Sequence, residues 1–169
     1  VYELSNISGS FRRNVSKGDV TLIKNTTYGT GILMRARASI KNVQSMGWGM
    51  YGIASIAGLA GETQNTNANN FELQKVAVQT CCLDGIYTEG GDANAGTIIG
   101  ADVNYCGGYG IRDNSFLGNH YFSCHTAGNA AGAYQSAIYN NFSVFVGCYS
   151  EGGTQVQPYY PMTSKFGRD

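Results

Sequence analysis

Two nine-residue stretches decide the fold: VQTCCLDGI at residues 78–86 and VNYCGGYGI at residues 103–111. Each begins with an apolar residue, places a cysteine three positions later and ends in Gly-Ile, and the two copies are 25 residues apart. Recurrence with a period of about 20–50 residues is the sequence signature of a repeat architecture. We therefore expect each copy to belong to one coil of a solenoid.

The frame of an apolar residue, two variable residues and a cysteine recurs along the chain. It appears as YFSC at 121–124 and FVGC at 145–148, and VQSM at 43–46 fits it with a different sulfur. Successive cysteines of the frame are separated by 25, 18 and 24 residues. Because equivalent positions of neighbouring coils stack about 4.8 Å apart, the frame predicts that these sulfur-bearing side chains form one column along the axis.

A Gly-Ile pair recurs along the chain together with this frame. It closes both quoted stretches, at 85–86 and 110–111, and an earlier copy stands at 52–53. We expect the chain to bend at the cysteine, to turn through a glycine with positive φ and to begin a new strand at the isoleucine.

The rest of the chain reads as short strands between turns. Runs rich in β-branched and aromatic residues, bounded by Gly or Asn, are typical of such strands, and helical periodicity is hard to find. They occur at residues 20–23, 32–34, 76–78, 97–105 and 142–146. The prediction is an all-β fold, a parallel β-solenoid of roughly six to eight coils at the stacking distance above.

Two polar stretches interrupt the strand pattern, at 62–70 and 129–141, and we expect both to project from the coils as surface insertions. A chain of 169 residues needs no more than one domain. We expect the solenoid to occupy residues 1–157 and residues 158–169 to be a C-terminal extension or linker. Neither end supplies an evident cap for the strand edges of a solenoid, which predicts a fragment of a longer chain.

Composition excludes several classes of function. Eleven Lys and Arg balance eleven Asp and Glu, which argues against a nucleic-acid partner, because such binding needs a basic surface. A hydrophobic content of 43% argues against disorder. No run of about 18 apolar residues occurs, so membrane insertion by a helix is not expected.

The five cysteines contain no C-x-x-C pair. Cys81 and Cys82 are adjacent, too close for an ordinary unstrained disulfide, and we expect buried free thiols at the bends. The alternatives are disulfides between stacked coils and a zinc site near Cys124, His125 and His120. We expect no metal and no cofactor. His120 and His125, the two histidines of the chain, are each a candidate general acid or base, and a structural role is the alternative.

Four blocks carry a family resemblance: EGGDANA at 89–95, DNSFLGNH at 113–120, CHTA at 124–127 and GCYSEGG at 147–153. They resemble right-handed parallel β-helix proteins of the pectate-lyase-like superfamily, and are most similar to the β-helices of bacteriophage and prophage tailspikes. The fold implied is a right-handed single-stranded parallel β-helix. One such scaffold hosts many activities, and none of the blocks is a catalytic motif.

The resemblance implies a tailspike or tail-fibre rod, on the virion or otherwise extracellular. It further implies a homotrimer that recognises bacterial surface polysaccharide and, in some relatives, degrades it. One alternative is a monomeric, secreted or surface-attached bacterial carbohydrate-active enzyme, a glycoside hydrolase or a polysaccharide lyase. The other is a purely structural segment of a fibre.

Carboxylates are the candidates for catalysis. Glycoside hydrolysis needs two of them about 5–9.5 Å apart, and the candidates are Glu89, Asp92 and Asp113, with Asp84 as a further partner for Glu89. Relative to the Gly-Ile pairs, Glu89 lies one position further along than Asp113, so a strict register places the two on opposite faces unless a bulge intervenes. Turn capping is the structural alternative. Arg112 is the only basic residue from 76 to 164, which disfavours a lyase.

Aromatic residues are the candidates for binding. Twelve tyrosines and one tryptophan offer flat faces for sugar stacking and a polar group for hydrogen bonds. We expect carbohydrate contacts from four aromatic residues near the predicted turns and one acid: Trp48, Tyr87, Tyr109, Tyr149 and Glu151. Stacked aromatic ladders in the core are the alternative role for some of them.

Overall fold

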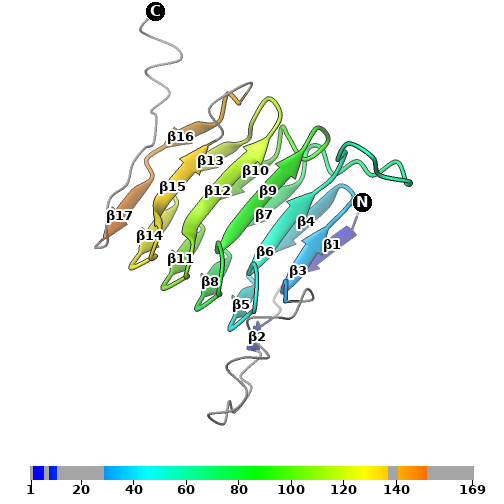
Figure 1. Ribbon diagram of the computed structural model, residues 1–169. Helices are drawn as coiled ribbons and strands as arrows, with labels where there is room; N and C mark the ends of the chain where they lie inside the picture. The colour runs from blue at the N-terminus through cyan, green and yellow to red at the C-terminus, as the bar shows by residue number, and fades with distance from the viewer. Residues whose placement is uncertain (1, 6–7, 11–28, 137–140, 152–169) are drawn as a thin grey trace, which may run out of the picture.

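The computed structural model describes residues 2–5, 8–10, 29–136 and 141–151, with side chains from residue 29 onward. These residues form an all-β structure of parallel strands and contain no helix (Figure 1). The strands make three sheets stacked as a β-solenoid of about 5 turns. The all-β class and the parallel solenoid are confirmed, and the number of coils is slightly lower than predicted.

Each coil contributes one strand to each sheet, in the order A, B, C. Sheet A contains β1 (Tyr2–Ser5), β4 (Ala38–Lys41), β7 (Glu72–Gln74), β10 (Thr97–Ile99), β13 (His120–Phe122) and β16 (Val144–Val146). Sheet B contains β2 (Ser8–Ser10), β5 (Gln44–Met46), β8 (Ala77–Gln79), β11 (Asp102–Asn104), β14 (His125–Ala127) and β17 (Tyr149–Glu151). Sheet C contains β3 (Ile32–Met34), β6 (Ile53–Ile56), β9 (Ile86–Gly90), β12 (Tyr109–Ser115) and β15 (Gly132–Ser136).

The Gly-Ile pairs mark equivalent positions, as the sequence predicts. Ile53, Ile86 and Ile111 are in register in sheet C and point into the core, where each is buried. The predicted reason for the glycines is wrong, because none of the three has a positive φ. A Cβ atom on Gly85 would lie 2.1 Å from Cγ1 of Val103 in the next coil. These positions require glycine because the neighbouring coil passes too close for any side chain.

The predicted single column of sulfur atoms is also wrong, because the cysteines occupy two different corners. Cys81 and Cys106 follow β8 and β11, at the corner between sheets B and C. Cys124 and Cys148 precede β14 and β17, at the corner between sheets A and B, where the Cys124 amide lies 3.4 Å from Sγ of Cys148. Met46 belongs to neither column, since it lies within β5, opposite Gln79. All five cysteines are free thiols, as predicted. The predicted burial is confirmed for Cys81, Cys106 and Cys124, wrong for Cys82, which is exposed, and only partly met by Cys148.

The core consists of the side chains that point inward from the centre of each strand. Alternation along a strand sends its neighbours outward. Sheets A and C contribute mainly large apolar residues: Ile40, Leu73, Ile98, Tyr121, Phe145, Ile53, Ile86, Ile111 and Tyr134. The Tyr121 and Phe145 rings stack with centroids 4.5 Å apart, so an aromatic ladder does fill part of the interior. No helix in the described residues has the length and apolarity to cross a membrane.

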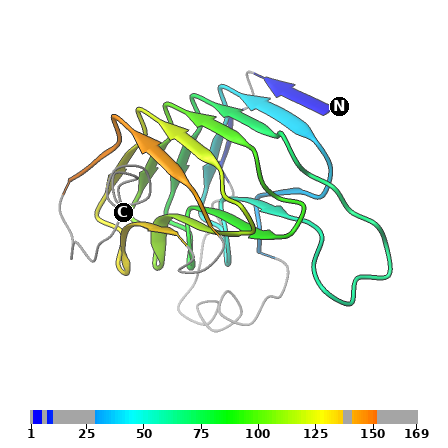
Figure 2. The same ribbon diagram turned by 90° about the horizontal axis from the view of Figure 1, so that it is seen from above.

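The first predicted insertion is confirmed only at its tip. The connection between β6 and β7, residues 57–71, projects from the coils at the right of Figure 2. Thr63, Gln64 and Asn65 are exposed at its tip. Further along, Ala68 is fully buried, and its amide donates a hydrogen bond of 2.8 Å to the carbonyl of Asp92. The second half of this connection is therefore part of the coil.

The second predicted insertion, 129–141, is wrong for residues 132–136, which form the sheet C strand β15. Its residues 137–140 lie outside the described residues, as do the predicted strand at 20–23 and the predicted extension at 158–169. The predicted domain boundary at residue 157 lies there too, so both domain assignments stay predictions.

A short Gly-Ser insertion should separate the two halves of the 57–71 connection. Placed after Gln64, it is expected to lower the free energy of unfolding by less than about 1 kcal/mol, because doubling a loop costs only about 0.6 kcal/mol. Placed after Ala68, it should cost several times more, since it displaces a buried residue from the coil. Urea unfolding of the two variants measures both values. Equal costs at the two sites would contradict this division of the connection.

Candidate functional site

The predicted site residues are distributed over several parts of the solenoid. Tyr87 and Glu89 point to the outer side of sheet C, and Tyr149 and Glu151 lie on the outer side of sheet B. Tyr109 begins β12, with its ring centroid 6.0 Å from the guanidinium carbon of Arg112. Trp48 lies at the corner between these sheets, half-buried, and packs against the core. The structure thus brings together two groups of candidates on two faces.

The outer face of sheet C carries a row of tyrosines that ends at an arginine. The Tyr51 and Tyr87 rings are stacked, with centroids 4.4 Å apart and planes 10° from parallel. Arg112 lies opposite Tyr87 on the next strand, and its guanidinium carbon is 5.9 Å from the Tyr87 centroid and 6.0 Å from that of Tyr109. We call this surface the tyrosine–arginine face, formed by Tyr51, Asp84, Tyr87, Glu89, Tyr109, Arg112 and Asn114.

Polar contacts fix the side chains of the tyrosine–arginine face. Asp84 Oδ1 accepts a hydrogen bond of 2.7 Å from the Tyr109 amide, and its Oδ2 lies 3.8 Å from Nη1 of Arg112. Asn114 Nδ2 donates to the Tyr87 hydroxyl at 3.2 Å. The guanidinium is therefore held between two rings and a buried carboxylate, a geometry that preorganises its remaining N–H groups for a ligand.

Burial shifts the pKa values of three groups on the tyrosine–arginine face. It raises the pKa of Tyr87 to about 12, with a smaller contribution from the Glu89 charge, and it also raises the pKa of Tyr51. Burial raises the pKa of Asp84 as well, against the opposing effects of the Tyr109 amide and Arg112. Both phenols thus remain protonated at neutral pH. The face presents hydroxyl, amide and guanidinium groups together with the Glu89 carboxylate.

Glu89 and Asp113 do not share a face. Asn114 is the residue in register with Glu89, whereas Asp113 is in register with Thr88. Regular pairing through β9 and β12 leaves no bulge, so the strict-register expectation of opposite faces is confirmed. Glu89 points outward, and Asp113 is fully buried inside the solenoid.

Six hydrogen bonds converge on the Asp113 carboxyl group. Oδ1 accepts from the Thr88 hydroxyl at 2.7 Å, the Ser115 amide at 2.9 Å and the Ser115 hydroxyl at 2.6 Å. Oδ2 accepts from Asn119 Nδ2 at 3.0 Å, the Tyr121 hydroxyl at 2.9 Å and the Ser143 hydroxyl at 2.6 Å. These partners lie in or next to β9, β12, β13 and β16. The carboxyl group therefore connects neighbouring coils at the corner between sheets C and A. This geometry favours a structural role over a catalytic one.

Asp92, the third predicted carboxylate, also has structural contacts. It lies in the turn between β9 and β10, where Oδ1 accepts a hydrogen bond of 3.3 Å from Asn69 Nδ2. Its amide donates to the carbonyl of Ala57 at 3.1 Å. Asp92 therefore holds the 57–71 connection against the coil, and it does not form a pair with Asp113 inside the solenoid.

The outer face of sheet B carries a second constellation. Asp102 Oδ1 lies 2.7 Å from Nδ1 of His125, and Nε2 of the same ring lies 3.9 Å from Oε1 of Glu151. The Tyr149 ring covers the imidazole, with centroids 4.6 Å apart. Asn104 Nδ2 donates to Asp102 Oδ1 at 2.9 Å. We call this set, Asp102, Asn104, His125, Tyr149 and Glu151, the histidine–carboxylate row.

Sequence reasoning missed Asp102 and the alignments behind both faces, although signals for them exist. Asp102 precedes His125 by 23 residues, which is one coil. Tyr51, Asp84 and Tyr109 directly precede the glycines of the three Gly-Ile pairs. Because these pairs are equivalent in successive coils, the three residues before them are equivalent too, and all three belong to the tyrosine–arginine face.

Away from both faces, a pocket of about 410 Å³ lies between β3, β4 and the 57–71 connection. Apolar side chains dominate its lining, with Ile32, Met34 and Ile40 from the strands, and none of the predicted site residues reaches it. In the described part of the chain, no group of three or more His, Cys, Asp and Glu side chains is placed to hold a metal ion.

Comparison with known proteins adds no relative. No protein-family model, no curated protein and no solved structure matches the chain. The functional assignment therefore depends on the two faces themselves.

Proposed function

We propose that this chain is the β-helix of a phage tailspike or tail fibre and that it recognises bacterial surface polysaccharide along the tyrosine–arginine face. The observation that carries the proposal is the row formed by Tyr51, Tyr87, Arg112 and Tyr109, in which one stacked pair of rings is followed, on the next coil, by a guanidinium near the Tyr87 and Tyr109 rings. The parallel solenoid is the fold that the resemblance to pectate-lyase-like tailspikes implies.

A polysaccharide suits this face because its chemistry repeats along the axis. A hydroxyl-rich chain laid across the coils would meet a tyrosine hydroxyl, a guanidinium or a carboxamide at successive steps of about 4.8 Å. Glu89 adds an acceptor for sugar hydroxyl groups on the same side. The rings of Tyr51 and Tyr87 cover one another, and Tyr87 is only 6% exposed, so the contacts offered to a ligand come from Tyr51, Arg112 and Glu89 while Tyr87 supports them from beneath.

The proposed activity is recognition, with assembly as a homotrimer on the virion or elsewhere outside the host cell. Hydrolysis by a pair of carboxylates would need a partner for Glu89 on its own face, and Asp113 points to the interior. Asp84 lies on that face but is engaged by the Tyr109 amide and lies beside Arg112.

One observation favours a carbohydrate-active enzyme as the second candidate. In the histidine–carboxylate row, Asp102 engages Nδ1 of His125, and Nε2 is buried without a hydrogen bond, 3.9 Å from Oε1 of Glu151, so Nε2 is the atom that would exchange a proton. If the chain cleaves glycans, His125→Gln should stop the release of new reducing ends and leave binding at the tyrosine–arginine face unchanged.

Arg112→Gln and Glu89→Gln are expected each to weaken glycan binding about tenfold or more, which corresponds to about 1.4 kcal/mol. A glycan array made from bacterial capsule and lipopolysaccharide fragments identifies a ligand, and titration calorimetry of the intact chain measures its affinity. The matched control is Tyr105→Ala, which removes an exposed tyrosine from the turn after β11.

An array on which the intact, folded chain binds nothing would contradict the proposal and favour the structural fibre segment. An affinity that falls for Tyr105→Ala but not for Arg112→Gln or Glu89→Gln would place the ligand on another surface.

A further inference from the structure

The outward positions of sheet C form two rows that cross neighbouring strands. The first row runs from β3 to β15 and consists of Leu33, Ala54, Tyr87, Arg112 and Gln135. The second row crosses β6, β9 and β12 and consists of Ile56, Glu89 and Asn114. Among these residues only Arg112 and Glu89 are charged. The others present apolar, aromatic or carboxamide side chains.

The positive charge of Arg112 is balanced within the protein. Its Nη1 lies 3.8 Å from Oδ2 of Asp84, a carboxylate that is buried at the edge of the tyrosine–arginine face. At the other end of the sheet, Arg35 follows β3 and forms an ion pair with Glu62. Neither guanidinium therefore offers a free positive charge to an acidic ligand, although the N–H groups of Arg112 can still donate to a sugar oxygen.

The negative charge of Glu89 is not balanced in this way. None of the ion pairs among the described residues includes Glu89. Burial is the main cause of the raised pKa of Tyr51, and the charges of Asp84 and Glu89 raise it further, against the effect of Arg112. The same two carboxylates therefore oppose any further negative charge that a ligand brings beside Tyr51.

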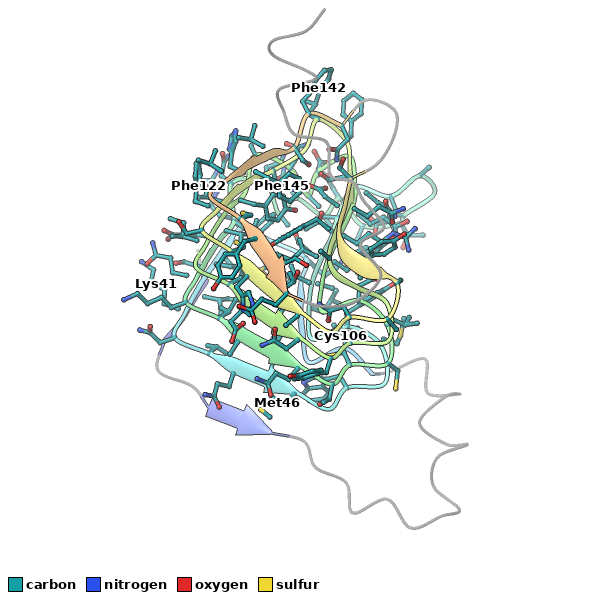
Figure 3. The ribbon with its side chains drawn as sticks, turned by 90° about the vertical axis from the view of Figure 1, so that its left-hand side faces the viewer. Lys41, Met46, Cys106, Phe122, Phe142 and Phe145 are labelled. Atoms are coloured by element: carbon teal, nitrogen blue, oxygen red, sulfur yellow. The ribbon has the colours of Figure 1, made fainter. Side chains whose placement is uncertain are left out.

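Other basic residues lie away from this face. Arg112 is the only Lys or Arg from residue 76 to residue 164, so this part of the chain supplies no second cation. The remaining basic side chains of the described residues follow β3 or lie in or after strands of sheet A: Arg35, Arg37, Lys41 and Lys75. Figure 3 shows Lys41 on the outer side of sheet A, where its Nζ lies 3.5 Å from Glu72 Oε2. An acidic polymer lying along sheet C would thus meet no row of cations.

We infer that the tyrosine–arginine face selects glycans that are uncharged where they touch it, and that Glu89 excludes sugars bearing a carboxylate. This inference rests on the proposed glycan recognition and names its ligand class. An ionised carboxylate only accepts hydrogen bonds, so the group that meets Glu89 must be a donor. A sugar hydroxyl donates to Glu89 and accepts from Arg112, whereas a uronate carboxylate has no proton to donate and is repelled.

The test uses the array of capsule and lipopolysaccharide fragments in two forms. One is left native, and in the other carbodiimide activation and borohydride reduction convert each uronate into the corresponding neutral sugar. We expect a uronate-containing fragment to bind the intact chain about tenfold or more tightly after reduction, measured by titration calorimetry. Raising the salt from about 0.1 M to about 1 M should shrink this preference, because the range of the repulsion falls from about 10 Å to about 3 Å.

Glu89→Gln should lose most of this preference for the reduced form, even though its affinity for neutral fragments also falls. The matched control is Glu72→Gln, which removes one negative charge from the outer side of sheet A and should keep the preference. Tighter binding of the native acidic form, or a preference that Glu89→Gln leaves intact, would overturn this inference and leave glycan recognition standing. A folded chain that binds no fragment in either form would overturn glycan recognition itself, and this inference with it.

Discussion

Asp113→Ala is expected to lower the free energy of unfolding by about 3–5 kcal/mol or more, or to prevent folding. The substitution removes the acceptor of six hydrogen bonds from a fully buried site and leaves the donors of Thr88, Asn119, Tyr121 and Ser143 without it. All the partners of Asp113 are neutral, so the cost comes from buried polar groups left unpaired, each worth about 1–3 kcal/mol. Asn119 and Ser143 keep other acceptors, whereas Thr88 and Tyr121 lose theirs. Urea unfolding followed by circular dichroism measures the change.

Glu89→Ala is the matched control for Asp113→Ala. Glu89 belongs to β9, the strand paired with β12, and lies opposite Asn114, the neighbour of Asp113, but its side chain points outward. Its cost should stay below about 1 kcal/mol, as for most surface substitutions. If Asp113→Ala were as stable as the unmodified chain and only lost activity on glycans, Asp113 would be catalytic and its structural assignment would be wrong.

Gly85→Ala is expected to cost about 3 kcal/mol or more, at the upper end of the range for overpacked cores. The added Cβ would lie 2.1 Å from Val103 Cγ1 and 2.8 Å from the carbonyl oxygen of Gly110. Val103 is buried and its β-branched side chain has little rotational freedom, and the carbonyl belongs to the backbone of the next coil. Neither can move away without opening the stack of coils.

Two further variants make this prediction specific. Gly91→Ala should be tolerated, since the nearest atom to the added Cβ is the Gly58 carbonyl oxygen at 3.4 Å. Adding Val103→Ala to Gly85→Ala should recover part of the lost stability, because it removes the closest atom. Strictly additive costs in this double-mutant cycle, measured by thermal unfolding, would show that the two positions do not touch.

The sequence predicts the fold well because the Gly-Ile pairs obey a constraint that acts between coils. Each glycine is required by the close passage of the next coil, and each isoleucine fills the same core position. Such a constraint repeats once per coil, so its period reveals the winding. The predicted positive φ was wrong because glycine serves close packing here, a requirement that a local sequence pattern cannot distinguish from turn geometry.

The cysteine frame led to the wrong prediction of a single sulfur column because two corners of the solenoid share one local sequence pattern. In Val78 to Cys81 the apolar residue belongs to sheet B, whereas in Tyr121 to Cys124 it belongs to sheet A. Both sheets have short strands with one inward residue before the bend, so the frame looks identical. The separation of 18 residues between Cys106 and Cys124, shorter than the other two, was the signal of a change of corner.

The candidate sites were less predictable than the fold, because they depend on register between coils. Placing Tyr87 beside Arg112, or Asp102 beside His125, requires knowing which residues of neighbouring coils are opposite one another. The Gly-Ile pairs supply that register in sheet C, and they correctly place Glu89 and Asp113 on opposite faces. In sheet B no comparable marker exists, so His125, Tyr149 and Glu151 were named as separate candidates but could not be placed together, and Asp102 was missed.

Interstrand nuclear Overhauser effects in sheet C test the central claim most directly, since both the tyrosine–arginine face and the buried Asp113 depend on the register of β6, β9 and β12. We predict backbone contacts of a parallel pattern that pair Ile53 with Ile86 and Ile86 with Ile111. A shift by one residue exchanges the two faces of a strand. Contacts that place Asp113 opposite Glu89, or an antiparallel pattern, would contradict the account.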